Sequence, residues 1–169
     1  MLRPIERLGA PVLQRPAERV ETFDAALGQL VDDLIDTMYA APGIGLAAPQ
    51  VGIPLRVCVI DLSVGKRGGE LLTLVNPEFV LREGMQIEEE GCLSVPGFTA
   101  TVPRAAEVTV RASDRHGQVR VIPATGLLAR ALQHEIDHLD GRLFLDRLRG
   151  IKRELIVRKI RKMQRAGRW

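Results

Sequence analysis

The sequence predicts an α+β fold in which mostly antiparallel sheets pack around a central metal-binding helix. Three observations support this prediction: a helical apolar pattern early in the chain, short strand-like runs in its middle, and a strongly apolar helical segment near residue 130. The connections between the strand-like runs are too short for helical crossovers, which favours antiparallel pairing. An N-terminal and a C-terminal helix complete the expected fold.

Length and composition fit one globular domain that covers residues 1–169. Hydrophobic residues make up 46% of the chain and charged residues 27%, as is usual for globular proteins. No run of 18 or more apolar residues occurs, and the first ten residues carry three charges where a secretion signal needs an apolar stretch. We therefore expect no membrane partner and a cytoplasmic location. The two cysteines, Cys58 and Cys92, do not suggest a disulfide framework, which agrees with a reducing compartment.

The first predicted helix covers residues 22–38, with Thr22 as its cap and Pro42-Gly43 as its stop. Strand-like runs and turn signals follow it. The predicted strands are 55–60, 71–75, 79–81, 85–88, 107–112 and 118–122, and the turns are Gly68-Gly69, Asn76-Pro77, Glu83-Gly84 and 114–117. Cys58 is expected in the core, and His116 is expected to be exposed in a turn.

A glycine-rich segment, residues 43–52, superficially matches the Gly-x-Gly-x-x-Ala part of a dinucleotide fingerprint. That fingerprint must follow a strand and open a helix, whereas here a helix precedes the segment and Pro49 interrupts it. We therefore expect no nucleotide cofactor. The small residues instead indicate a backbone that another group approaches closely, with the Gln50 amide at its end.

The central helix is predicted from about Thr125 to Asp140 and contains His-Glu-x-x-His. Residues i and i+4 share a helix face, so His134 and His138 can reach one metal ion with Glu135 beside it. The competing interpretation is a buried helix with two hydrogen-bonded histidines. Because apolar residues cover most of the circumference, we expect this helix in the interior.

Cys92 is the best third ligand, because it lies between Gly91 and a Leu-Ser-Val-Pro run that predicts a loop. Acidic neighbours raise the pKa of a thiol and weaken it as a nucleophile, whereas a metal holds the thiolate regardless. Two histidines and one cysteine leave a fourth position open on a tetrahedral ion, which is typical of a catalytic site. Ligand softness alone allows zinc, iron, cobalt or nickel.

In order and spacing, three stretches resemble the signature motifs of bacterial-type peptide deformylases. These stretches are Gly43-Ile44-Gly45-Leu46-Ala47-Ala48-Pro49-Gln50, Glu90-Gly91-Cys92-Leu93-Ser94 and Gln133-His134-Glu135-Ile136-Asp137-His138. The resemblance implies a hydrolase that removes the N-formyl group from the initiator methionine of new polypeptides and releases formate. It also implies one divalent metal ion, usually Fe(II), with zinc, nickel or cobalt able to replace it.

The same resemblance assigns roles to individual residues. Cys92, His134 and His138 match the metal ligands, and Glu135 matches the general base and acid. Gln50 and the backbone N–H of Leu93 match the groups that stabilise the oxyanion. The peptide is expected to lie as an added strand beside Ile44-Gly45 and Gly91. The methionine pocket is expected at Ile44, Leu127, Arg130, Ala131 and His134.

Two departures from the family pattern leave the peptide contacts beyond methionine open. Thr99 stands where some members carry an arginine, and Arg130 stands where they carry an apolar residue. Arg104 is either a structural partner for Asp137 or a surface arginine.

The basic segment 147–169 contains ten Lys or Arg residues and one Glu, whereas the preceding 146 residues hold 14 basic and 20 acidic residues. One interpretation is a solvated helix face, and the other is a contact with phosphate-rich ribosomal RNA. Two further functional hypotheses remain besides deformylation. They are a His-Glu-x-x-His endopeptidase and a catalytically inactive ribosome-binding protein.

Overall fold

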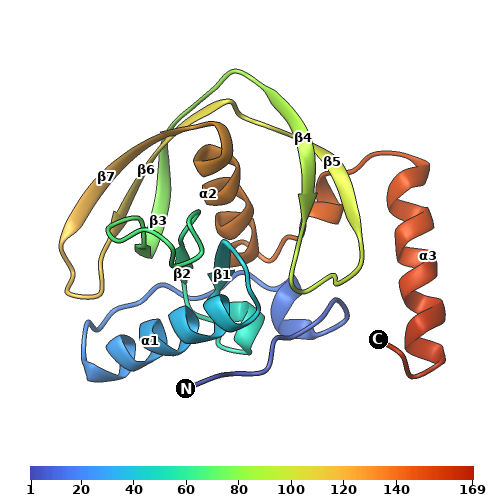
Figure 1. Ribbon diagram of the computed structural model, residues 1–169, viewed down its shortest axis with the longest axis horizontal. Helices are drawn as coiled ribbons and strands as arrows, with labels where there is room; N and C mark the ends of the chain where they lie inside the picture. The colour runs from blue at the N-terminus through green and yellow to red at the C-terminus, as the bar shows by residue number, and fades with distance from the viewer.

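The computed structural model describes residues 1–169 and has the predicted α+β fold (Figure 1). The α-helices are α1 (Ala25–Ala40), α2 (Gly126–Leu139) and α3 (Ile151–Arg165). The strands are β1 (Gly45–Ala47), β2 (Val57–Ile60), β3 (Leu72–Glu83), β4 (Gln86–Gly91), β5 (Thr99–Arg104), β6 (Glu107–Ser113) and β7 (Val119–Thr125). Short 3-10 helices cover Pro11–Gln14 (η1), Ala48–Val51 (η2) and Phe144–Arg147 (η3).

Two antiparallel sheets enclose α2. A five-stranded sheet has the order β1-β2-β3-β6-β7, and β4 and β5 form a separate two-stranded sheet. Residues Gly91 and Thr99 are paired at the end of the smaller sheet, next to the loop that joins its strands. Figure 1 shows α2 between the two sheets, α1 across one end, and α3 on the outer side beyond β4 and β5. The central position predicted for α2 is confirmed.

Helix α1 begins later than the sequence suggested. Asp24, not Thr22, occupies the N-cap, and its carboxylate accepts a hydrogen bond from the Leu27 N–H at 3.0 Å. A carboxylate at this position satisfies one of the free N–H groups of the first turn. The apolar side of α1 is buried and contributes Val31, Leu34 and Met38 to the core.

The two strands predicted on either side of Asn76-Pro77 form one continuous strand, β3, so the predicted turn is wrong. Asn76 has φ of 52°, and its side-chain amide exchanges two hydrogen bonds with the backbone of Val20 at 2.8 and 3.0 Å. Asparagine tolerates this left-handed conformation, which the sheet absorbs as an irregularity in the β3–β6 register. The hydrogen bonds with Val20, which lies 56 residues earlier in the chain, therefore hold Asn76 within the strand where a turn was predicted.

Strands β1 and β5 were not predicted. β1 has three residues within the glycine-rich segment, and β5 contains Pro103, which weakens a strand pattern. The turn at Gly68-Gly69 and the hairpin at residues 114–117 are confirmed, and the chain bends at Gly84 directly after Glu83 ends β3. Cys58 is completely buried and His116 is exposed, both as expected.

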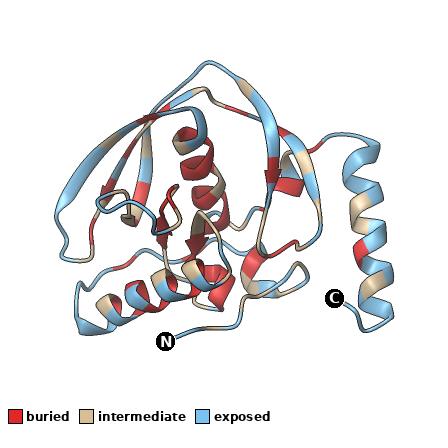
Figure 2. Cartoon of the chain, viewed as in Figure 1, coloured by how far each residue is buried: buried red, intermediate tan, exposed pale blue.

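Helix α3 starts at Ile151 and not at Arg147, because Phe144–Arg147 forms the separate 3-10 helix η3. Figure 2 shows α2 almost entirely buried and α3 almost entirely exposed. None of the helices combines the length and the apolar content that crossing a bilayer requires.

Candidate active site

Three segments that are distant in the sequence meet at α2. They are the β1–η2 segment, the loop after β4, and the turns of α2 that carry the His-Glu-x-x-His motif. Thr125 occupies the N-cap position of α2, as predicted, but its side chain makes no capping hydrogen bond. Ten of the fourteen residues of α2 are buried, so packing against both sheets fixes the helix and its motif.

Cys92, His134 and His138 converge so that their ligand atoms all lie within 4.8 Å of one another. The His138 Nε2 atom lies 3.3 Å from both the His134 Nε2 atom and the Cys92 Sγ atom. Two nitrogen ligands bound about 2.05 Å from a tetrahedral ion stand about 3.3 Å apart. These spacings suit the ligands of a single metal ion, and the three predicted ligands are brought together.

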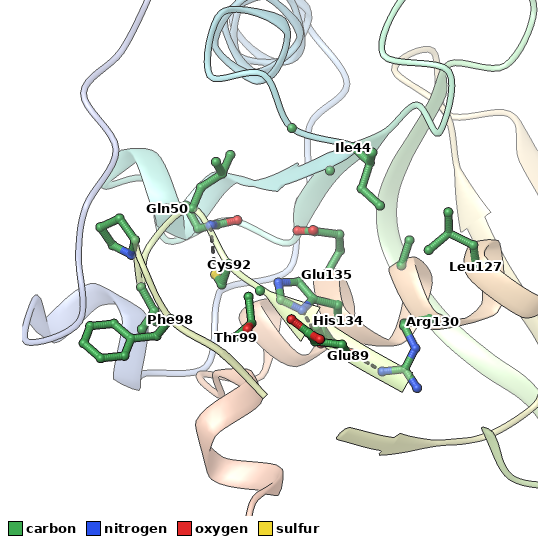
Figure 3. Close-up of a pocket in the computed structure, with 18 of the residues that line it drawn as sticks. Ile44, Gln50, Glu89, Cys92, Phe98, Thr99, Leu127, Arg130, His134 and Glu135 are labelled. Carbon is green, nitrogen blue, oxygen red and sulfur yellow. Dashed lines mark hydrogen bonds and ion pairs between the residues drawn. The ribbon is translucent and has the colours of Figure 1, made fainter. Parts of the chain in front are cut away.

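Cys92 lies in the loop after β4 and is partly accessible. Its sulfur accepts a hydrogen bond from the Ser94 N–H at 3.4 Å and a longer one from the Gln50 amide at 3.7 Å (Figure 3). Donors aimed at sulfur stabilise the thiolate form that binds metal.

Glu90 is a site residue that the sequence reasoning missed. Its carboxylate lies 2.5 Å from His134 Nδ1, which leaves Nε2 of that ring directed at the other ligands. Carboxylates commonly orient metal-binding histidines in this way. Burial pushes the pKa of Glu90 upward, but its contacts with His134 and Arg104 outweigh burial and hold that pKa well below its usual value. The sequence did offer one signal for Glu90, because a buried histidine that binds metal through one ring nitrogen needs a hydrogen-bond partner for the other.

Arg104 and Arg130 support Glu90 from two sides. Arg104 donates to both Glu90 oxygens, at 2.5 and 3.1 Å, and also to Asp137 at 2.6 Å. Arg130 donates to Glu90 at 2.5 Å and to the Val102 carbonyl at 2.8 Å. Arg104 is thus a buried structural partner of Asp137 and not a surface arginine.

Glu135 points into the site without a hydrogen-bond partner for its Oε2 atom, although that atom is buried. Burial raises the pKa of Glu135 to about 7, despite the opposing charge of His134. A carboxylate with this pKa exchanges a proton readily near neutral pH. Gly45 allows the close approach, because a Cβ atom there would lie 2.5 Å from Glu135 Oε1.

Gln50 and Leu93 offer hydrogen-bond donors beside this carboxylate. Gln50 Oε1 accepts from the Ala47 N–H at 2.9 Å, and its Nε2 donates to Ser94 Oγ at 3.1 Å. These contacts fix the amide with its NH₂ group toward Cys92 (Figure 3). The Leu93 N–H makes no hydrogen bond within the chain.

A cavity of about 480 Å³ opens onto these groups. All six residues predicted to bind substrate line it: Ile44, Gly45, Gly91, Leu127, Arg130 and Ala131. Thr99, which the sequence connected with peptide contacts beyond methionine, also lines it, as do Val95, Pro96 and Phe98, which the sequence analysis did not assign to the pocket wall. The guanidinium of Arg130 is committed to Glu90 and Val102, and the residue is only 4% exposed, so its aliphatic stem forms the wall.

An open Cys-His-His metal site beside a buried glutamate, on a helix enclosed by antiparallel sheets, defines a metal-dependent hydrolase. Comparison with known families makes the assignment specific. The polypeptide deformylase family model matches residues 2–154. The chain belongs to the polypeptide deformylase family, whose members remove the N-formyl group from nascent peptides.

Relatives and solved structures agree over nearly the whole chain. The peptide deformylase of Acidobacterium capsulatum is 54% identical over 169 residues, which cover 100% of this chain and 99% of that protein. A crystal structure of a peptide deformylase from Legionella pneumophila superposes with a TM-score of 0.92 and 49% identity, covering 99% of this chain and 98% of that one. The Thermus thermophilus enzyme gives a TM-score of 0.89 and 42% identity, with 96% and 95% coverage.

Proposed function

We propose that residues 1–169 form one catalytic domain that deformylates N-formylmethionyl peptides with Cys92, His134 and His138 as ligands of one Fe(II) ion. The convergence of their three ligand atoms within 4.8 Å carries this proposal. Zinc, nickel or cobalt fits the same donor set. When bound, the ion supplies Lewis acidity toward the formyl oxygen and lowers the pKa of a water.

Glu135 acts as the general base and then as the general acid. Its unpartnered oxygen accepts a proton from the attacking water and returns that proton to the amine that leaves. The buried setting that raises its pKa suits both steps, because the carboxyl group must hold the proton transiently. Glu90 keeps His134 in the orientation required for this arrangement.

Gln50 and Leu93 stabilise the negative oxygen that develops on the formyl carbon. The Gln50 NH₂ group is held by its hydrogen bonds before substrate arrives, and the Leu93 N–H has no partner within the chain to give up, so little reorganisation is needed. The reaction hydrolyses the C–N bond of the formamide, giving formate and a free amino group.

The peptide lies as an extended strand between Ile44-Gly45 and Gly91, with the methionine side chain toward Leu127 and Ala131. Gly45 and Gly91 lack side chains on the two cavity edges, so backbone contacts dominate recognition. Thr99 and the wall formed by Arg130 shape contacts beyond methionine.

Helix α3 is proposed to contact ribosomal RNA in the cytoplasm, where nascent chains emerge. Of the ten basic residues in 147–169, Arg147 pairs with Asp137 and Arg153 with Asp146, which leaves eight without an ion pair. Their single-sign charge favours a polyanion. Replacing Arg158, Lys159 and Lys162 with glutamine is expected to reduce co-sedimentation with ribosomes at low salt, and unchanged co-sedimentation would contradict the contact.

A substrate comparison tests the main proposal. The iron-loaded protein, prepared without air, is expected to release formate from formyl-Met-Ala-Ser and to leave an N-acetylated analogue and internal peptide bonds intact. Cleavage of internal bonds without formate release would instead indicate an endopeptidase. A metal-loaded protein that releases no formate would indicate an inactive relative.

A further inference from the structure

The aromatic residue Trp169 lies beyond residues 2–154, the range matched by the family model, and contacts the wall of the active site. Its ring packs on Phe98 with centroids 6.2 Å apart at an interplanar angle of 58°. Phe98 in turn lines the catalytic cavity (Figure 3). The chain after α3 thus reaches back to a residue that lines the cavity.

A second connection runs through the backbone of Leu8. The Trp169 indole N–H donates to the Leu8 carbonyl at 2.8 Å, and the Leu8 N–H donates to the Ser94 carbonyl at 2.9 Å. Ser94 also contacts the proposed catalytic groups, because its hydroxyl accepts from Gln50 and its N–H donates to Cys92. Leu8, Phe98 and Trp169 all pack against the same apolar cluster around Ile160.

We infer that Trp169 is a positioning residue that holds the segment Cys92–Phe98 in its productive conformation and thereby sets peptide affinity. The inference rests on the proposed roles of Cys92, Leu93 and the cavity wall. The segment itself has only two local backbone hydrogen bonds, from Val95 to Cys92 and from Phe98 to Val95, and the second is long at 3.4 Å. The aromatic contact therefore supplies much of the order at Phe98.

The expected effect is on binding more than on chemistry. Ordering one side chain on binding typically costs about 0.5–1.5 kcal/mol, which corresponds to roughly 2- to 13-fold in affinity. Trp169→Ala should therefore raise KM for formyl-Met-Ala-Ser by about 3- to 10-fold and change kcat by less than about 2-fold. Trp169→Phe keeps an aromatic ring on Phe98, so its KM should stay near the wild-type value.

The experiment compares kcat, KM and metal content in wild type, Trp169→Ala, Trp169→Phe and the exposed-neighbour control Arg168→Ala. Phe98→Ala, with and without Trp169→Ala, closes a double-mutant cycle. In the Phe98→Ala background, loss of Trp169 should raise KM by less than it does in wild type, since the ring contact is already absent and only the connection through Leu8 remains.

Fluorescence gives a readout that does not require turnover, because Trp169 is the only tryptophan in the chain. Formyl-Met-Ala-Ser titrated into metal-loaded Glu135→Gln should change the emission saturably. The inference is overturned if Trp169→Ala leaves KM unchanged, if its KM effect in Phe98→Ala is as large as in wild type, or if only kcat falls in proportion to lost metal. A wild type without formate release would refute the proposed function, while the titration would still test the contact.

Discussion

Helices α2 and α3 have similar lengths, 14 and 15 residues, but opposite relations to the rest of the molecule (Figure 2). In α2 ten residues are buried, whereas in α3 only Ile160 is. Burial lets α2 hold titratable groups in fixed geometry, and it makes every polar group there depend on a partner. Exposure lets α3 carry many like charges whose energy solvent screens. The difference predicts where substitutions change chemistry and where they change only surface contacts.

The largest effect is expected at Cys92, the proposed metal ligand that faces α2 from the loop after β4. Cys92→Ser removes the thiolate and should abolish stoichiometric metal binding together with formate release, because two histidines alone bind the ion far more weakly. Cys58→Ser is the matched control: Cys58 is buried in β2 and is not among the residues that converge on the site. Metal analysis of both purified variants decides, and equal metal content would contradict the ligand assignment.

The second-largest effect is expected at Gln50, the hydrogen-bond donor that faces α2 from η2. Gln50→Ala should lower kcat/KM by about 100- to 1000-fold, as expected for loss of one oxyanion donor. Metal content should stay at the wild-type level, because Gln50 is not a ligand. Gln50→Glu is a size-matched companion that introduces negative charge and should be at least as impaired. Activity within a few-fold of wild type in Gln50→Ala would remove this residue from the mechanism.

Substitution of Glu90 tests whether the stability of the fold around α2 depends on the negative charge of this residue. Glu90→Gln should destabilise the fold by about 3 kcal/mol at pH 7, since Arg130 then remains buried without a counter-charge and Arg104 keeps only Asp137. The folded-state pKa of Glu90 is depressed, so its contribution is fully present above the unfolded value near 4.5 and is lost progressively as pH falls from there through the lower folded-state pKa.

Urea unfolding at several pH values measures this contribution. The free-energy difference between wild type and Glu90→Gln should be largest at pH 7 and should shrink as pH falls from about 5 toward 3. Exposed Glu89 is the adjacent control, and Glu89→Gln should change stability by less than about 0.5 kcal/mol. A difference in unfolding free energy between wild type and Glu90→Gln that does not change with pH would contradict the ionised state of Glu90.

The smallest effect is expected on α3. Replacing Arg158, Lys159 and Lys162 with glutamine should change unfolding free energy by less than about 0.5 kcal/mol per site. Formate release from a free tripeptide should also stay within about 2-fold of wild type, since none of these side chains lines the cavity. Thermal unfolding and steady-state kinetics check both expectations, and a large loss in either would give α3 a structural role.

Local pattern predicted the α+β class, the central helix and the three turns that contain glycine. It did not predict that Asn76 continues β3, because the contact that holds its backbone comes from Val20, far away in the sequence. β1 was missed for a similar reason: three residues carry too little periodicity, and pairing with β2 determines their conformation.

The ligand atoms converged as the motifs predicted, whereas Glu90 received no role although it opens the motif that contains Cys92. Three consecutive glutamates looked equivalent in the sequence. Only the pairing of β4 with β5 turns Glu90 inward toward Arg104 and His134 while Glu89 stays exposed. The contact of Trp169 with Phe98 was equally invisible, because tertiary packing alone joins residues so far apart in the chain.

The most direct test of this account measures metal content and formate release together in Glu135→Gln. The variant should bind as much metal as wild type, because Glu135 is not one of the three converging ligands. Its formate release from formyl-Met-Ala-Ser should fall by about 100- to 10,000-fold, the range expected for loss of a general acid and base. A metal-loaded Glu135→Gln that retains activity within about 10-fold of wild type would contradict the account, given that general acid–base catalysis supplies at least about 100-fold.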